Sequence, residues 1–145
     1  MIALIQRVNW VKLSIGNELH SEIGRGLLAL VGLEKQDDLA RGERLLSKIL
    51  AYRVFPDSED KMNLSLADID GDLMLVSQFT LAADTDKGLR PGFSSALPPQ
   101  AAEQLYGEIL DLARLKYKKV ESGVFAANMQ IALENDGPVT FILRS

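Results

Sequence analysis

Cysteine is absent from this chain of 145 residues, and histidine and tryptophan each occur once. Without cysteine the chain has no disulfides, no thiolate ligands for zinc and no cysteine nucleophile. The lone His20 cannot build a multi-histidine metal site, and no neighbouring sequence suggests a Ser-His-Asp triad around it. We therefore expect no metal or other cofactor, and any enzyme chemistry must proceed without the usual imidazole base.

Long apolar runs and linker-like segments are missing as well. No stretch approaches the roughly 20 apolar residues that a membrane-spanning helix needs, so a membrane partner is not expected. The first eight residues resemble a β-strand, without the basic segment and small-residue cleavage site of a signal peptide. With 47% hydrophobic residues and scattered glycine and proline, residues 1–145 predict one compact domain. The lack of cysteine fits a location in the cytoplasm.

An excess of positive charge is also lacking. The net charge is −4, whereas a protein that grips a long stretch of nucleic acid needs a basic surface to neutralise phosphates. Extended binding of DNA is therefore not expected. A pocket that receives only the end of an RNA needs few basic side chains, so this kind of binding stays open.

Period-two alternation of apolar residues predicts several strands. Between residues 2 and 15 the apolar positions change parity around Trp10-Val11, so we expect a bulge or bend in a long first strand. Gly16-Asn17 is expected to turn this strand into the next. The predicted strands cover residues 2–15, 18–23, 27–33, 73–81, 129–134 and 139–143.

Two helices are predicted from apolar residues at helical spacing. The first follows the N-cap candidates Asp37 and Asp38, and the second runs from about Pro98 to Tyr117 after an irregular loop at 83–98. Their expected buried faces are Leu39, Leu45, Leu46 and Ile49, and then Leu105, Ile109, Leu112 and Leu115. The fold class is accordingly α/β, with two main helices packed on a mostly antiparallel sheet.

Two apparent motifs do not support a function. Residues 24–29 match the dinucleotide-binding pattern Gly-x-Gly-x-x-Gly/Ala, but a leucine-rich strand follows where that motif needs a helix, so a hairpin turn is predicted. Residues 68–72 resemble a calcium loop without its closing acidic ligand, so they predict a solvated turn.

Two polar stretches stand out. At residues 77–81 an apolar strand acquires Ser77, Gln78 and Thr80, and period two would place Ser77 and Phe79 on the face opposite Gln78 and Thr80. This is either a strand end that reaches solvent or a place where an ester carbonyl lies against Ser77, Gln78 and backbone amides that stabilise an oxyanion. Thr80 is a candidate attacking hydroxyl, although no base to activate it is visible.

The second stretch is residues 135–140, which predict a tight turn between two strands. Only about 5–6% of X-Pro bonds in folded proteins are cis, so the local sequence favours a trans peptide before Pro138. Gly137-Pro138 nevertheless offers two carbonyl acceptors, lacks one N–H group and carries no bulky side chain at position 137.

Together the two stretches, Ser77-Gln78-Phe79-Thr80-Leu81 and Asn135-Asp136-Gly137-Pro138-Val139-Thr140, resemble the signature pair of the D-aminoacyl-tRNA deacylases. The similarity runs nearly end to end and includes residues 5–8, 26–28, 31–35, 61–65 and 90–94. Val124 and Asn128 depart from the family, which usually has Arg and Asp there. Both departures bear on binding of the tRNA end more than on the chemistry.

The resemblance implies a homodimer that hydrolyses the ester between a D-amino acid, or glycine, and the 3′-end of tRNA. Ser77, Gln78, Phe79 and Thr80 would line the catalytic pocket, and the 2′-hydroxyl of the terminal adenosine would assist attack by water. A cis Gly137-Pro138 pair would reach into the pocket of the partner subunit and leave no room for an L side chain. Asn135 would share in substrate binding, Arg7 would brace the pair, and Phe125 and Met129 would pack the adenosine.

Two other function classes stay open. One is an RNA-binding module without catalysis, disfavoured by the acidic composition and the lack of an aromatic stacking motif. The other is a hydrolase of small esters or amides that uses Asp84 and Asp86 as a carboxylate pair or metal site. Two aspartates beside Lys87 and Arg90 are also what an ordinary solvated loop contains.

Overall fold

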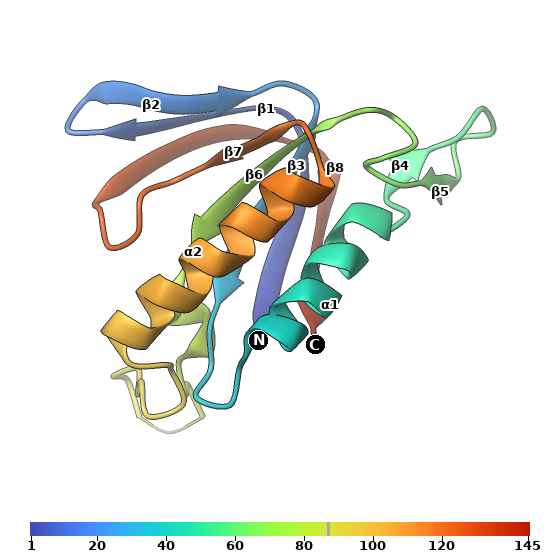
Figure 1. The fold of residues 1–145 in the computed structure, drawn as a ribbon. Coiled ribbons are helices and arrows are strands. Elements are labelled where there is room, and N and C mark those ends of the chain that lie inside the picture. The colour runs from blue at the N-terminus through green and yellow to red at the C-terminus, as the bar shows by residue number, and fades with distance from the viewer. Residues whose placement is uncertain (87) are drawn as a thin grey trace.

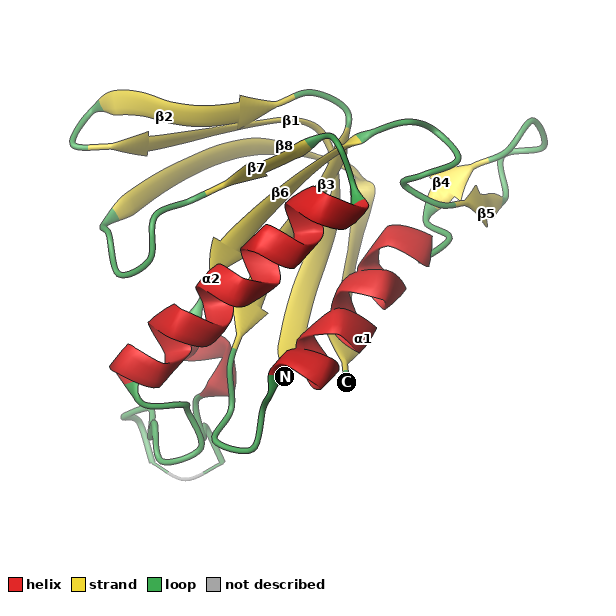
Figure 2. Ribbon diagram, viewed as in Figure 1, coloured by secondary structure: helices red, strands yellow, loops and turns green. Residues whose placement is uncertain are grey.

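A six-stranded mixed sheet with two helices on one face forms the body of the protein (Figures 1 and 2). The computed structural model describes residues 1–86 and 88–145. The elements are β1 (Ile2–Ile15), β2 (Glu18–Ile23), β3 (Gly26–Gly32), α1 (Leu39–Ala51), β4 (Phe55–Pro56), β5 (Met62–Leu64), β6 (Asp72–Ser77), the 3₁₀ turn η1 (Phe79–Ala82), α2 (Pro99–Lys116), β7 (Val120–Ser122) and β8 (Met129–Arg144). No helix in the described ranges is long and apolar enough to cross a membrane.

Strand β1 organises the sheet. It pairs antiparallel with β8, and along its other edge with β3 and then β2. Because Val8 lies opposite Gly26 and Val11 opposite Ile23, β2 and β3 follow one another in the same direction along β1. The hairpin turn predicted after β2 is therefore wrong, since Gly24-Arg25 joins two collinear strands. A Cβ on Gly26 would lie 1.8 Å from the Asp72 carbonyl oxygen, so this position requires glycine.

The predicted bulge in β1 is confirmed. Pairing with β8 steps from Val8 opposite Asn135 to Trp10 opposite Glu134, which leaves Asn9 as the extra residue. The parity change allows both Val8 and Val11 to enter the same apolar cluster.

The edge containing β6 is parallel. Strand β6 pairs parallel with β3 and with β7, because α1 lies between β3 and β6 in the chain and α2 lies between β6 and β7. Among the pairings of the main sheet in the described ranges, three are antiparallel and two are parallel. The prediction of a mostly antiparallel sheet therefore holds only in part. The short strands β4, β5 and β7 were not predicted at all.

Both helices pack on the same face of the sheet (Figure 1). Helix α1 begins after Asp38, whose carboxylate accepts a hydrogen bond from the Arg41 amide at 2.8 Å, so the predicted cap is confirmed. The buried residues of α2 are Ala102, Leu105, Tyr106, Ile109 and Ala113. Leu115 is 83% exposed, contrary to prediction, because the buried stripe advances by three or four residues and passes it. Leu39 at the start of α1 is exposed as well.

The opposite face of the sheet holds a second, smaller core. It contains Val8, Val11, Leu13, Ile23, Leu28, Met74 and Val76. The sheet curls over this core until β2 approaches β7, where the Ser21 hydroxyl donates a hydrogen bond to the Ser122 carbonyl at 3.0 Å. The curl leaves the start of β8 beside the end of β6, and this juxtaposition shapes the candidate site.

Strand β8 runs without a hairpin, so the turn predicted at residues 135–138 is wrong. Pairing with β1 is present at Asn135 opposite Val8 and again at Thr140 opposite Gln6. The four residues 136–139 lie opposite the single residue Arg7, so they form a large irregular bulge in a continuous strand. Proline lacks an N–H group for the sheet, which suits an interruption of the pairing at this point.

Candidate active site

A cavity of about 770 Å³ opens where β6 ends. Among the described residues, its walls come from six segments: the end of β3 and the residues after it, the end of β6, the loop before α2, the first turn of α2, the loop that leads into β8, and the start of β8. The lining residues are Val31, Leu33, Lys35, Val76, Ser77, Gln78, Phe79, Phe93, Ser94, Ala96, Leu97, Pro98, Pro99, Ala102, Phe125, Ala126, Ala127, Asn128, Met129 and Ile131. The walls are largely apolar, and a few polar groups cluster at the end of β6, as in many sites for small organic groups.

Strand β6 ends at Ser77, four residues earlier than predicted. Gln78 donates its amide to the Val31 carbonyl at 2.7 Å, and the chain then enters the 3₁₀ turn η1. The alternating faces predicted for residues 77–81 are therefore wrong beyond Ser77. Phe79 is 60% exposed on this turn and packs against Phe93, with ring centroids 5.0 Å apart.

The turn rests directly on Gly32, the last residue of β3. A Cβ at this position would lie 2.8 Å from the Leu81 Cβ and 3.1 Å from the Gln78 carbonyl oxygen. Only a residue without a side chain lets the two backbones approach this closely. The glycine therefore fixes the height of η1 above the sheet.

Hydrogen-bond donors gather at the start of η1. The first backbone bond of the turn runs from the Leu81 amide to the Gln78 carbonyl at 3.2 Å, so the amides of Phe79 and Thr80 precede it. The Gln78 side-chain amide donates to the Thr80 hydroxyl at 2.6 Å. Ser77, Gln78 and Phe79 line the cavity, while Thr80 is exposed beside them. This arrangement suits stabilisation of a developing oxyanion.

Tyr106, which was not singled out in the sequence, supports the end of β6 from beneath. Its buried hydroxyl donates to the Leu75 carbonyl at 2.9 Å, and its ring centroid lies 6.1 Å from that of Phe125. Burial raises the pKa of the Tyr106 hydroxyl well above its usual range, so the group stays a donor. The only sequence signal was a tyrosine next to the apolar stripe of a predicted helix.

The loop from Gly123 to Asn128 contributes its residues 125–128 to another wall of the cavity. Gly123 donates its amide to the same Leu75 carbonyl at 3.1 Å, and a Cβ on Gly123 would lie 2.6 Å from the Met129 sulfur. Phe125 and Met129, predicted to pack the terminal adenosine, both line the cavity, and so does Asn128. Val124 is exposed.

The Gly137-Pro138 pair forms a braced, exposed tip. Its peptide bond is cis, as the family resemblance implies, and the trans bond favoured by the local sequence alone is wrong. Arg7 donates through Nε to the Asp136 carbonyl at 3.1 Å and through Nη1 to the Val54 carbonyl at 2.7 Å. Asn135 accepts the Val139 amide at 3.1 Å on its Oδ1 and donates from Nδ2 to the Thr140 hydroxyl at 2.9 Å. The brace thus comes from side chains on both β1 and β8.

One chain alone does not bring the tip and the cavity together. In the described part of the chain, Arg7, Asn135, Gly137 and Pro138 are not among the residues that line the cavity. The tip stands opposite Arg7 in β1, whereas the cavity lies beyond the opposite end of β3, where Val31 pairs with Ser77.

Asp68, Asp70 and Asp84, which lie in the two acidic stretches considered in the sequence, have local partners away from the cavity. Asp68 accepts from the Ser65 amide at 2.8 Å and the Ser65 hydroxyl at 2.7 Å, and these bonds lower the pKa of its carboxyl. Asp70 pairs with Lys119 at 2.7 Å. Asp84 accepts from the Asp86 amide at 3.0 Å in a loop, and in the described ranges neither aspartate lines the cavity. Lys87, beside them in the sequence, lies outside the described residues.

Similarity to known proteins extends along nearly the whole chain. Residues 4–144 match the profile of the D-Tyr-tRNA(Tyr) deacylase family. Proteins named D-aminoacyl-tRNA deacylase from Stutzerimonas stutzeri and Cellvibrio japonicus are 55% and 50% identical, over 100% and 99% of this chain and 100% and 98% of their own lengths. The solved c-Myc DNA unwinding element binding protein is 38% identical and superposes with a TM-score of 0.95 over 100% of this chain and 99% of its own.

A probable eukaryotic D-amino acid tRNA deacylase shares the fold alone. It is 16% identical, with a TM-score of 0.84 over 98% of this chain and 97% of its own. The profile match and the full-length relatives settle the family. The chain belongs to the D-Tyr-tRNA(Tyr) deacylase family.

Proposed function

We propose that this protein hydrolyses the ester bond between a D-amino acid and the 3′-terminal adenosine of tRNA in the cytoplasm, releasing free tRNA and the amino acid. Family membership supports this activity, as do the names of relatives that are at least 50% identical over nearly their full lengths. The structural observation that carries it is the largely apolar cavity at the end of β6, which is lined by Ser77, Gln78 and Phe79 at the start of the turn η1.

In this proposal the cavity stabilises the transition state by position and electrostatics. The ester carbonyl lies against the start of η1, where the amides of Phe79 and Thr80 and the side chain of Gln78 receive the developing oxyanion. Water adds to the carbonyl carbon, and the bond from that carbon to the ribose oxygen then breaks. The 2′-hydroxyl of the terminal ribose assists the attacking water, and the proton that this water loses is passed to the departing ribose oxygen.

Selection of the D form would need two subunits. The Gly137-Pro138 tip is exposed, braced by Arg7, and lies away from the cavity of its own chain. We infer a homodimer in which the tip enters the cavity of the partner subunit and offers its carbonyls to the substrate amino group. The backbone wall at the α-carbon then excludes an L side chain, and glycine is accepted because it has no side chain to exclude.

Matched tRNAs test the activity and its handedness together. With D-tyrosyl-, glycyl- and L-tyrosyl-tRNA at equal concentration, we expect the first two to be hydrolysed and the L ester to react at least about 100-fold more slowly. Release of amino acid from purified tRNA is the measurement. Equal rates for the D and L esters would exclude the proposed chiral wall. RNA affinity that depends on salt, without any ester loss, would instead indicate a non-catalytic RNA-binding module.

The source of the assisting hydroxyl can be tested separately. We expect Thr80→Ala to keep turnover within about tenfold of wild type. A substrate ending in 2′-deoxyadenosine should be hydrolysed at least about 100-fold more slowly, because general acid–base catalysis contributes on the order of 10²–10⁴-fold to the rate. Single-turnover rates on bound substrate separate chemistry from binding. If Thr80→Ala abolishes turnover while folding and binding are intact, the protein hydroxyl takes part directly and the RNA-assisted route is wrong.

We do not propose DNA binding for this protein, although the c-Myc DNA unwinding element binding protein carries that activity in its name. That structure is similar in fold and sequence. The net charge of −4 opposes binding to long nucleic acid. A substrate that inserts only its aminoacylated end needs no extended basic surface.

A further inference from the structure

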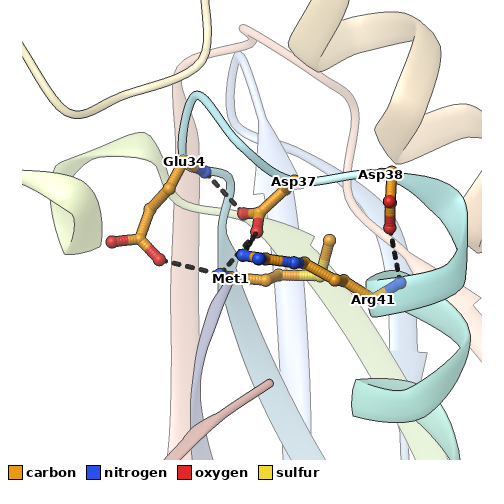
Figure 3. A network of polar contacts seen from close by, with 5 residues as sticks. All are labelled: Met1, Glu34, Asp37, Asp38 and Arg41. Atoms are coloured by element: carbon orange, nitrogen blue, oxygen red, sulfur yellow. Dashed lines mark hydrogen bonds and ion pairs between the residues drawn. The ribbon is translucent and has the colours of Figure 1, made fainter.

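The α-amino group of Met1 is buried between two carboxylates (Figure 3). Its nitrogen lies 2.7 Å from Glu34 Oε2 and 2.7 Å from Asp37 Oδ1. The Asp37 side chain is fully buried, while that of Glu34 keeps 33% of its surface exposed. Charge-assisted hydrogen bonds of this length in a buried place are strong and geometrically specific.

The two carboxylates belong to a closed turn. The second oxygen of Asp37 accepts the Glu34 amide at 2.7 Å, and the Asp37 amide donates to the Glu34 carbonyl at 2.9 Å. This pattern holds both acids on one side of the turn, facing the ammonium group. Arg41 approaches Asp37 only at 3.6 Å, so a neutral group at Met1 would leave a buried carboxylate poorly compensated.

The same turn supports a wall of the cavity. Lys35 donates its amide to the Ser95 carbonyl at 3.0 Å, and the Leu97 amide donates to the Leu33 carbonyl at 2.9 Å. Leu33 and Lys35 line the cavity from one strand of this small bridge, and Leu97 lines it from the other. A displacement of the turn at residues 34–37 therefore moves residues 95–97 as well.

We propose that the α-ammonium group of Met1 is a positioning group for this cavity wall. A chain that is acylated or extended at Met1 before it folds has a displaced turn at 34–37 and binds substrate more weakly. Once the chain has folded, the amine is shielded from acylating reagents. The expected effect on turnover rests on the proposed function, whereas the effect on the wall does not.

The test compares protein with a free Met1 amine and protein acetylated there during expression. We expect acetylation to raise KM for D-tyrosyl-tRNA about tenfold with kcat within about twofold, a coupling of ordinary size between two sites. Amide hydrogen exchange in residues 93–97 should quicken relative to β1. Glu34→Gln and Asp37→Asn should each raise KM and quicken exchange in residues 93–97. The effect of Glu34→Gln should be the smaller one, because the Glu34 side chain is partly exposed and that of Asp37 is buried.

Asp38→Asn is the matched control, because Asp38 neighbours Asp37 in sequence but caps α1 through the Arg41 amide. It should leave KM and exchange in residues 93–97 unchanged. Unchanged exchange and KM after acetylation would overturn the inference, and so would a uniform loss of stability without a local change at 93–97. If the protein with a free Met1 amine hydrolyses no D-tyrosyl-tRNA, the proposed function fails. The comparison of amide hydrogen exchange in residues 93–97 still decides the role of the amine.

Discussion

Gly32→Ala is expected to lower kcat/KM for D-tyrosyl-tRNA by at least about 100-fold, because a misplacement of catalytic groups by about 1 Å can cost that much. The new Cβ would lie 2.8 Å from the Leu81 Cβ and 3.1 Å from the Gln78 carbonyl oxygen. Neither atom is the end of a flexible side chain, so the whole turn must rise away from β3. The amides of Phe79 and Thr80 would move with it.

Gly107→Ala in α2 is the matched control. Among the described residues a Cβ on Gly107 meets no atom within 4 Å, and the residue lies in a helix. This variant should gain roughly 0.5–1 kcal/mol in free energy of unfolding and keep full activity. Steady-state kinetics and denaturant unfolding on both variants are the measurements. Wild-type kcat/KM in Gly32→Ala would show that η1 does not hold the reacting groups.

Gly137→Ala is expected to reduce hydrolysis of D-tyrosyl- and glycyl-tRNA to about 1% of the wild-type rate or less, because it too misplaces groups that position the substrate. Gly137 has a φ of +131°, which an L side chain rarely adopts. Its Cβ would also lie 2.7 Å from the Val139 Cγ2 and 3.2 Å from the Arg7 Nη2, so the braced tip must change shape. The protein should still fold, because the tip is exposed.

Gly16→Ala controls for backbone conformation alone. Gly16 has a φ of +58°, and a Cβ there meets no described atom within 4 Å. We expect it to lose on the order of 1 kcal/mol in stability without loss of activity.

Mixed dimers test whether the tip acts across subunits. Gln78→Ala, which lacks the proposed oxyanion donor, should lose on the order of 100-fold in turnover by itself. Coexpression of Gly137→Ala with Gln78→Ala should restore roughly a quarter of wild-type turnover, since random pairing gives one intact composite site in each heterodimer. If the mixture is as inactive as the two separate variants, the tip does not serve the partner's cavity.

Local sequence predicted the features that depend on near neighbours. The cap at Asp38 needs only the first turn of its helix, and the bulge at Asn9 follows from the change of parity between Val8 and Val11. The turn at Gly16-Asn17 is also confirmed, with positive φ at both residues. In each case the deciding interactions lie within a few residues along the chain.

Features decided by distant contacts were predicted poorly. Asn135-Asp136-Gly137 has the composition of a turn, but β1 pairs with the chain on both sides of it, so β8 continues. Strand β6 ends early because the chain leaves the ladder after the bond from the Gln78 amide to the Val31 carbonyl and turns onto Gly32. The residues of both signature stretches were found through family resemblance, because neither stretch carries a local signal strong enough to exclude an ordinary loop or strand end.

The carbonyl of Leu75 accepts hydrogen bonds from two directions, the Tyr106 hydroxyl in α2 and the Gly123 amide in the loop before β8. A single oxygen atom thus ties together a helix, a strand and a loop. Neither α2 nor the loop before β8 can move away from β6 without breaking one of these two bonds. The cavity should therefore keep its width, and the proposed discrimination between D and L esters would depend on that constant width.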